Sequence, residues 1–299
     1  MTWRFYAGAV VVVASACGGQ DAPAPTGPDA VPPVGPSSGF VETLVGAGDI
    51  GWCGLPGAEL TASLLDRIPG TVFTVGDNAY PSGTARAFRD CYDPWWGRHR
   101  ARTRPTPGNH DYETPGAAGY FGYFGASAAP PDGYYGYRAG SWYVVALNSE
   151  ISAFPGSPQY EWLRRELTAN PTRCALAYFH TPVFGSGTNG GNPHMQAVWT
   201  VLYGAGVDVV VNGHNHSYER FSPQDPQGRA DPARGIRRFT VGTGGSPLTG
   251  FPQVRPNSEV RNATSWGVLK LTLLPDAYEW EFLPVAGQMF SDRGTGLCH

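Results

Sequence analysis

The chain has 299 residues, with 41 glycines and 28 prolines, a content that raises the question of disorder. Hydrophobic residues make up 41% and aromatic residues 13% of the sequence, and such apolar content is enough to offset the entropy cost of folding a core. With 15% charged residues and a net charge of -3, the chain lacks the clustered lysine and arginine of a nucleic-acid binder. No nucleic-acid partner is therefore expected, and small or neutral partners fit better.

The N-terminal residues have the pattern of an export signal. Arg4 precedes an apolar run over residues 7–14, which is too short to span a bilayer, and small residues follow at 14–16. Cys17 comes next and resembles the lipid-modified cysteine of bacterial lipoproteins. Residues 1–17 therefore predict export, with lipid anchoring through Cys17 favoured over simple cleavage and release. We expect a membrane-anchored lipoprotein or a periplasmic or extracellular protein.

Residues 18–39 hold six prolines and five glycines and have almost no apolar bulk. This composition predicts a tether. Glycine and proline stay abundant from residue 40 to residue 299, so this part is expected to form one loop-rich domain.

Four cysteines remain beyond Cys17, namely Cys53, Cys91, Cys174 and Cys298. An even number in an exported protein predicts two disulfides. We favour Cys53 with Cys91 and Cys174 with Cys298, because these bonds would join the first two loop regions and tie down the C-terminus. Buried free thiols are the alternative, and zinc binding is disfavoured because no two of the cysteines are close in sequence.

Short apolar runs alternate with helical segments along the domain, which predicts an α/β fold. Strands are predicted at 41–47, 71–75, 142–147, 174–179 and 207–211, and helices at 58–68, 84–96, 158–169 and 195–203. After about residue 235 only strands are predicted, at 236–241, 267–274 and 278–282. The expected architecture is a layered core with additional antiparallel strands. A Gly-rich aromatic stretch at 119–125 and 134–137 fits either the mouth of a substrate site or ring packing, and packing is favoured.

Polar residues that can bind metals follow the predicted strands directly. The segments are Gly48-Asp49, Gly76-Asp77-Asn78-Ala79-Tyr80, Phe179-His180 and Gly213-His214-Asn215-His216, and a further loop holds Gly108-Asn109-His110-Asp111. Ligands of α/β sheets bind beyond the carboxyl ends of the strands, so these segments can converge on one crevice. Of the seven histidines, only His99 and His299 lie outside these segments and the nearby His194.

The types of side chain indicate the kind of metal site. Two carboxylates, a carboxamide, a phenol and three imidazoles form a set of oxygen and nitrogen ligands without thiolate, which excludes iron–sulfur clusters and copper(I) sites. Seven ligands are too many for one tetrahedral zinc but suit two ions that share a carboxylate. Two ions about 3.5 to 4 Å apart form the known clamp for in-line attack on phosphorus.

These ordered blocks, between residues 48 and 216, resemble the purple acid phosphatase branch of the calcineurin-like metallophosphoesterases. The resemblance implies a layered metallophosphoesterase fold, with a β-sandwich core flanked by helices and metals at the C-terminal strand ends, and makes residues 40–299 the catalytic domain. It also implies a binuclear site of Fe(III) and a divalent metal (Fe, Zn or Mn). Asp49, Tyr80 and His216 would hold the ferric ion, Asn109, His180 and His214 the divalent ion, and Asp77 would bridge them.

Tyr80 distinguishes this branch from most metallophosphoesterases. Most of them carry Asp-x-His in the first block, whereas this chain has Asp49-Ile50-Gly51, and the phenol of Tyr80 takes the place of the missing histidine. A phenolate is a hard anionic donor that prefers a trivalent ion. Two other departures are Thr181, where many bacterial relatives have a second histidine, and Asn215, where Asp is common.

His110 and His194 match positions where the family places histidines outside the metal shell. They would stabilise phosphate charge and supply a proton to the leaving group. The implied activity is hydrolysis of small phosphate monoesters. The alternatives are a phosphodiesterase or nucleotide hydrolase with the same site and, less favoured, a non-catalytic surface lipoprotein.

Overall fold

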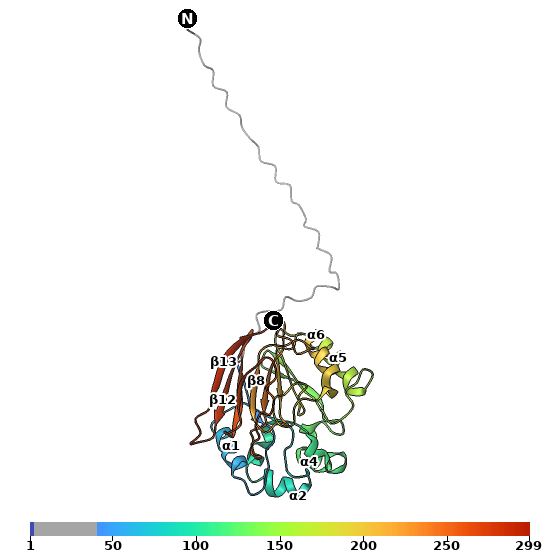
Figure 1. The fold of residues 1–299 in the computed structure, drawn as a ribbon. Coiled ribbons are helices and arrows are strands. Elements are labelled where there is room, and N and C mark those ends of the chain that lie inside the picture. Colours follow the sequence, from blue (N-terminus) through green and yellow to red (C-terminus); the bar gives the residue numbers. More distant parts are fainter. Residues whose placement is uncertain (3–40) are drawn as a thin grey trace, which may run out of the picture. The chain divides into compact units, whose positions relative to one another are not determined.

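The computed structural model describes residues 1–2 and 41–299. The predicted export signal with Cys17 and the predicted tether lie outside the described residues. The described residues from Val41 onward belong to one structural unit, whose helices and strands are shown in Figure 1. Among the described helices, none has the length and apolar character needed to cross a bilayer.

The first sheet has six strands in the order β13-β12-β11-β1-β2-β3. Its strands are β1 (Glu42–Ala47), β2 (Thr71–Val75), β3 (Thr103–Thr106), β11 (Gly267–Leu273), β12 (Ala277–Pro284) and β13 (Asp292–Leu297). Strands β1, β2 and β3 are parallel to one another, whereas β11, β12 and β13 extend the sheet in antiparallel fashion. The carboxyl ends of β1, β2 and β3 therefore meet at one edge of the sheet.

The second sheet has seven strands in the order β10-β8-β9-β7-β6-β5-β4. Its strands are β4 (Tyr135–Ala139), β5 (Trp142–Ala146), β6 (Ala175–Tyr178), β7 (Val209–Asn212), β8 (Tyr218–Phe221), β9 (Arg237–Val241) and β10 (Ser258–Asn262). Strands β5, β6, β7 and β9 are parallel. The expectation that the strands after residue 235 are antiparallel is thus wrong for β9, which pairs in parallel with β7.

The two sheets pack face to face around one large core. Aromatic side chains meet across the interface, as Phe73 of β2 does with Tyr178 of β6 at 5.8 Å and Phe239 of β9 with Trp280 of β12 at 5.7 Å between ring centroids. The β-branched and aromatic residues on both faces of the central strands are buried, so these strands are apolar on both sides.

Helices lie beside the two sheets and at the ends of their strands (Figure 1). They are α1 (Gly57–Leu65), α2 (Ala85–Ala87), α3 (Asn109–Tyr112), α4 (Ala118–Phe124), α5 (Pro158–Ala169) and α6 (Gln196–Gly204), with shorter helical turns η1 (Phe88–Tyr92), η2 (Trp96–Arg102), η3 (Pro115–Ala117), η4 (Gly125–Ala128) and η5 (Pro193–Met195). Helices α5 and α6 pack Leu163, Trp199 and Leu202 onto the seven-stranded sheet in a second core, away from β12 and β13 (Figure 1).

The mixed α/β fold with two packed sheets confirms the expected fold class. The helix predicted at 84–96 is broken into α2 and η1, whose turn is wider than an α-helical one. Both favoured disulfides are present, Cys53–Cys91 and Cys174–Cys298. The aromatic stretch at 119–125 packs rather than opening to solvent, because Tyr120 and Phe124 of α4 are buried in the main core.

Candidate metal centre

The seven predicted ligands come together where strands of both sheets end. Asp49, Asp77 and Asn109 follow β1, β2 and β3, whereas His180 follows β6 and both His214 and His216 follow β7. Parallel strands bring their carboxyl ends to one edge of a sheet, and the packing of the two sheets places the two edges side by side. We call the set Asp49, Asp77, Tyr80, Asn109, His180, His214 and His216 the polar cluster.

The turns that carry the cluster have unusual backbone conformations. Asp49, Asp77 and His214 have φ angles of 59°, 49° and 69°, in the left-handed region that non-glycine residues seldom adopt. Such strain persists only where surrounding contacts hold it, and it gathers at functional sites. Here the turns hold one another, because Asp49 N–H donates to the Gly76 carbonyl at 3.0 Å and Gly213 N–H donates to the His180 carbonyl at 3.0 Å.

Two glycines allow the loops to approach so closely. A Cβ atom on Gly76 would lie 2.4 Å from Nδ1 of His180, and one on Gly108 would lie 2.3 Å from Oδ1 of Asp77. Neither position has room for a side chain. These glycines are therefore required by the packing of the cluster as well as by the turns themselves.

The first half of the cluster surrounds the hydroxyl of Tyr80. Its oxygen lies 2.9 Å from Asp49 Oδ1, 2.9 Å from Asp77 Oδ2 and 2.9 Å from His216 Nε2, and His216 Nε2 is also 3.3 Å from Asp49 Oδ1. A phenol has one proton, which can serve only one of the two carboxylates. The arrangement thus suits a cation among these atoms better than it suits hydrogen bonds.

The second half surrounds the side-chain oxygen of Asn109. Asn109 Oδ1 lies 3.0 Å from His180 Nε2 and 3.0 Å from His214 Nδ1. Asp77 belongs to both halves, because its Oδ2 is 2.9 Å from the Tyr80 hydroxyl and 3.3 Å from His180 Nε2. Two sets of donors that share one carboxylate are the pattern expected for two neighbouring ions.

Backbone carbonyls orient two of the imidazoles. Nδ1 of His180 lies 2.8 Å from the Val75 carbonyl, and Nδ1 of His216 lies 2.9 Å from the Pro247 carbonyl. A carbonyl only accepts, so each Nδ1 carries a proton and Nε2 is the atom that faces the cluster. Such outer hydrogen bonds fix the tautomer and direction of histidines that bind metals.

The buried carboxylates shift the pKa values of neighbouring groups, because a negative charge favours a protonated neighbour. Burial alone would lower the pKa of His180, but the charge and hydrogen bond of Asp77 outweigh it and raise this pKa to about 10. The same pair keeps the pKa of Asp77 below its usual range, although burial alone would raise it. Burial and the charges of Asp49 and Asp77 raise the pKa of Tyr80 well above its usual value. Asp49, Asp77 and His180 also lie close enough to hold one metal ion, so the residues fit a cationic centre.

Sequence reasoning gave no role to Asp111, although it stands in one of the quoted blocks. Asp111 is fully buried, and its Oδ2 accepts hydrogen bonds from Gly108 N–H at 3.0 Å and from the side chain of Asn78 at 2.9 Å. Burial, helped by the charge of Asp77, raises the pKa of Asp111 to about 7. It holds the loop of Asn109 against the loop of Asp77 across 33 residues of sequence. Its place in the block Gly108-Asn109-His110-Asp111, two residues after the predicted ligand Asn109, is the only sequence signal for this role.

The two predicted catalytic histidines are placed differently. His110 lies beside the cluster: its backbone N–H donates to Asp77 Oδ1 at 2.8 Å, its Nε2 is 4.0 Å from Asp77 Oδ2, and its side chain is 34% exposed. His194 instead has Nε2 at 2.8 Å from the Ile151 carbonyl and its ring against Phe154. Within the described residues, His194 makes no hydrogen bond to the polar cluster.

The two departures from the family pattern leave the cluster intact. The Thr181 hydroxyl donates to Glu150 at 3.2 Å, so the side chain of this residue is directed toward a neighbouring loop. The buried Asn215 side chain bonds the backbone of Asn189 and Gly190. Asn215 therefore points away from the ligands.

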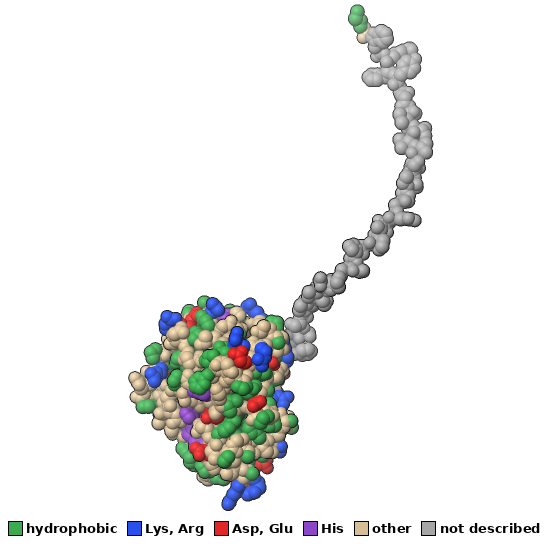
Figure 2. Space-filling model, turned by 90° about the vertical axis from the view of Figure 1, so that its right-hand side faces the viewer, with side chains coloured by type: hydrophobic (Ala, Val, Ile, Leu, Met, Phe, Trp, Pro, Cys, Tyr) green, Lys and Arg blue, Asp and Glu red, His purple; other side chains and the backbone are tan. Residues whose placement is uncertain are grey.

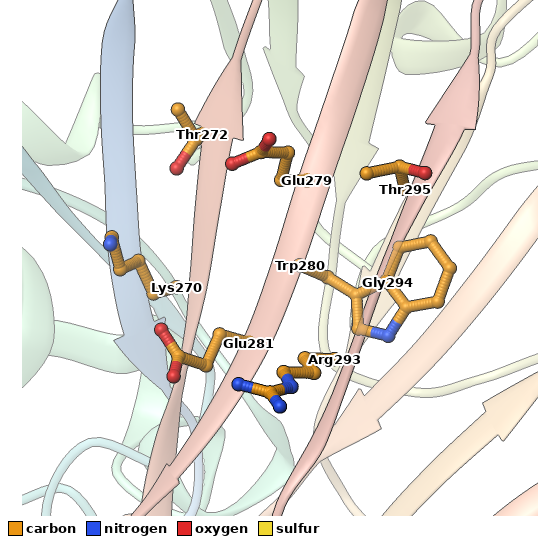
Figure 3. Close-up of a pocket in the computed structure, with 8 residues that line it drawn as sticks. All are labelled: Lys270, Thr272, Glu279, Trp280, Glu281, Arg293, Gly294 and Thr295. Carbon is orange, nitrogen blue, oxygen red and sulfur yellow. The ribbon is translucent and has the colours of Figure 1, made fainter.

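The cluster is open to solvent on one side. The side chain of His216 is 15% exposed, and the exposed part of His110 lies nearby; Figure 2 shows histidine side chains gathered on one face of the domain. A separate cavity of about 480 Å³ lies over β11, β12 and β13, lined by Lys270, Glu279 and Arg293 among others (Figure 3). None of its lining residues belongs to the polar cluster.

Comparisons with known proteins agree with this geometry. The family model described as calcineurin-like phosphoesterase matches residues 43–218, a range that holds the whole polar cluster. Purple acid phosphatase 18 of Arabidopsis thaliana is 29% identical over a region covering 71% of this chain and 51% of its own length. Purple acid phosphatase 21 of the same plant is 30% identical over 71% of this chain and 52% of its own length. The chain thus spans about half the length of these curated relatives.

Two solved structures share the fold. A purple acid phosphatase from seeds of yellow lupin (Lupinus luteus) has a TM-score of 0.68 at 21% identity and covers 87% of this chain and 54% of its own. GAP50, the anchor in the inner membrane complex of Plasmodium, has a TM-score of 0.65 at 14% identity, with 86% of this chain and 89% of its own covered. At these identities the likeness concerns the fold alone.

Proposed function

The chain belongs to the calcineurin-like phosphoesterase family, as the sequence blocks predicted, and we propose that it hydrolyses phosphate monoesters at a centre of two metal ions. The observation that carries this proposal is the division of the polar cluster into two halves that share Asp77. The purple acid phosphatases among the relatives support the same activity. Small phosphate esters are the proposed substrates.

The donor chemistry of each half favours a different ion. Asp49, Tyr80 and His216 would hold Fe(III), because a phenolate is a hard anionic donor that prefers a trivalent ion. Asn109, His180 and His214 would hold a divalent ion (Fe, Zn or Mn), and Asp77 would bridge. Bound in this way, the two metals supply a hydroxide nucleophile and neutralise charge on the phosphoryl group.

His110 is the residue that would transfer the proton. Its Nδ1 lies 2.5 Å from the Pro81 carbonyl, so this nitrogen is protonated and Nε2 is directed toward the cluster. The imidazolium form would give up its Nε2 proton to the departing oxygen of the ester. His194 stays a prediction as a second proton donor, because its described contacts are with Ile151 and Phe154.

Two other readings share this fold. A phosphodiesterase or nucleotide hydrolase would use the same cluster and differ only in the surroundings of the substrate. The other alternative is a non-catalytic surface lipoprotein, and GAP50, which shares the fold, is an anchor in the inner membrane complex of Plasmodium. The presence of every predicted ligand in one cluster favours catalysis over an anchoring role.

Assays of the purified protein would test the proposal. We expect hydrolysis of p-nitrophenyl phosphate at acidic pH, two bound metals of which one is iron, and a visible absorption band from tyrosinate bound to Fe(III). A protein that binds no iron, shows no such band and hydrolyses no phosphate ester would refute the assignment.

We further propose that the protein is exported and anchored through a lipid on Cys17. Two disulfides among the described residues support an oxidising compartment. Replacing Cys17 with Ser should move the protein from the membrane fraction to the soluble fraction of a bacterial host, as measured by detergent phase partition. Equal partition of both forms would contradict lipid anchoring.

A further inference from the structure

Three rings surround the buried ring of Tyr80 at the open side of the polar cluster. The ring centroid of Trp52 lies 4.8 Å from that of Tyr80, that of His110 lies 4.5 Å away, and that of His216 lies 5.8 Å away. Tyr80 is only 3% exposed, whereas Trp52, His110 and His216 are partly exposed. A substrate that reaches the cluster from solvent therefore passes these three rings.

Trp52 differs from the two histidines because it has no part in holding metals or protons. Its backbone is fixed on both sides: the Gly51 carbonyl accepts a hydrogen bond from Tyr80 N–H at 2.9 Å, and Cys53 is joined to Cys91. Trp52 N–H itself donates to the Ile50 carbonyl at 2.9 Å. A flat side chain on such a fixed backbone loses little entropy when it binds another flat group.

Aromatic rather than basic side chains contact the residues of the cluster at its open side. In the described part of the chain, no lysine or arginine forms an ion pair or a hydrogen bond with a residue of the polar cluster. The open side of the cluster instead offers aromatic surface, which binds flat uncharged groups by stacking.

We propose that Trp52 binds the leaving group of the substrate and that this group is flat and aromatic, either an aryl group or a nucleoside. The inference rests on the proposed function, since it assigns the part of the substrate that lies outside the phosphate. Stacking on Trp52 holds the ester with its phosphate at the cluster and its leaving oxygen toward His110. Trp52 is thus a residue that determines specificity.

The test compares three monoesters with the full-length protein in its metal-loaded form. They are p-nitrophenyl phosphate, adenosine 5′-monophosphate and glycerol 3-phosphate, which carry an aryl, a nucleoside and an aliphatic leaving group. We expect Trp52→Leu to raise KM for the two aromatic esters by about 5-fold to 10-fold and to change KM for glycerol 3-phosphate by about twofold at most. Trp52→Phe should restore most of the loss. Phe290→Leu is the control, because Phe290 is also partly buried but packs on Tyr218 and Phe282.

Calorimetric titration with adenosine 5′-monophosphate and with inorganic phosphate decides the question even without turnover. The proposal requires that Trp52→Leu weaken binding of the nucleotide and leave binding of phosphate within about twofold. Equal losses for all ligands, accompanied by a shifted tyrosinate band, would mean that Trp52 only supports Tyr80. A loss for only one of the two aromatic esters would identify the class of leaving group. A protein that hydrolyses none of the esters yet binds the nucleotide through Trp52 would overturn the proposed function and leave Trp52 as a binding residue for flat aromatic groups.

Discussion

The Tyr80 hydroxyl lies 2.9 Å from an oxygen of Asp49, 2.9 Å from an oxygen of Asp77 and 2.9 Å from Nε2 of His216. In a metal-free site the phenol can donate to only one of the two carboxylates, so the other contact brings lone pairs together, which costs free energy in a buried place. A cation bound to the phenolate would turn all three into favourable contacts. The geometry around this residue is the strongest local argument for a metal that accepts a phenolate ligand.

Replacing Tyr80 with Phe should remove the visible absorption band and lower kcat for p-nitrophenyl phosphate at least 10-fold. The ring would still pack between Trp52 and His110, whose centroids lie 4.8 Å and 4.5 Å from that of Tyr80. The fold should therefore survive while the trivalent ion loses a ligand. The visible spectrum, iron content and steady-state rate of the purified variant measure these effects.

Tyr92→Phe is the matched control for that experiment. Tyr92 is fully buried like Tyr80, but its hydroxyl has no hydrogen-bond partner among the described residues. Its loss should change neither the spectrum nor the rate. An unchanged absorption band in Tyr80→Phe, or an equal loss in Tyr92→Phe, would show that Tyr80 is not an iron ligand.

Residues that end a strand could be predicted as site residues, and residues that support them could not. Asp49 and His180 were identified because each follows an apolar run directly. Asp111 contacts Asn78, and Trp52 contacts Tyr80. Only the fold brings these partners near each other. Their roles depend on contacts between residues about 30 positions apart in the sequence. The periodicity of apolar residues predicts helices and strands but not such long-range contacts.

At the scale of elements, the strands that escaped prediction are mostly those at the edges of the sheets. Strands β3 and β13 flank the six-stranded sheet, and β4 and β10 flank the seven-stranded one. An edge strand is less buried and tolerates proline and charge, as Pro105 in β3 and Glu259 with Arg261 in β10 illustrate. Interior strands such as β6 and β7 are buried throughout, and their apolar runs made them predictable.

The turn after β2 gives a second prediction, through Gly76→Ala. Gly76 has a φ of 81°, and an added Cβ would lie 2.4 Å from His180 Nδ1. The new methyl group must displace His180 from the Val75 carbonyl that orients it. We expect loss of the divalent metal and at least a 10-fold fall in kcat, measured by metal analysis and p-nitrophenyl phosphate turnover.

Gly287→Ala is the control for that experiment, because it introduces the backbone strain of a positive φ without displacing a neighbouring side chain. Gly287 has a φ of 84° but no atom within 4 Å of an added Cβ. Its substitution should cost about 1–2 kcal/mol of stability through the backbone alone and leave metal content and rate unchanged. If both variants lose metal equally, the contact between an added Cβ at position 76 and His180 is not the cause of the metal loss.

For the whole molecule, the polar cluster connects the two sheets at the ends of their strands. Asp49 and Asp77 come from the six-stranded sheet, and His180 and His214 come from the seven-stranded one. Cys174–Cys298 ties the start of β6 to the C-terminus, and Cys53–Cys91 joins the loop after β1 to η1. Metals at the cluster would therefore add a second link between the two sheets, at the carboxyl ends of their central strands, to the one that Cys174–Cys298 makes.

Metal binding should stabilise the whole domain because unfolding would destroy the cluster. A ligand at 100 times its Kd stabilises the folded state by about 2.7 kcal/mol, and for a domain of this size each kcal/mol raises Tm by roughly 2–4 °C. We expect the metal-free protein, prepared by chelation, to unfold roughly 5–10 °C below the loaded protein in a thermal scan by circular dichroism. His214→Ala should reduce this difference, because it removes a ligand from one half only, whereas His99→Ala, outside the cluster, should not. A Tm that does not respond to metal, in a protein that binds two ions, would mean that the unfolded chain binds the ions as tightly as the folded domain does, and would contradict this prediction.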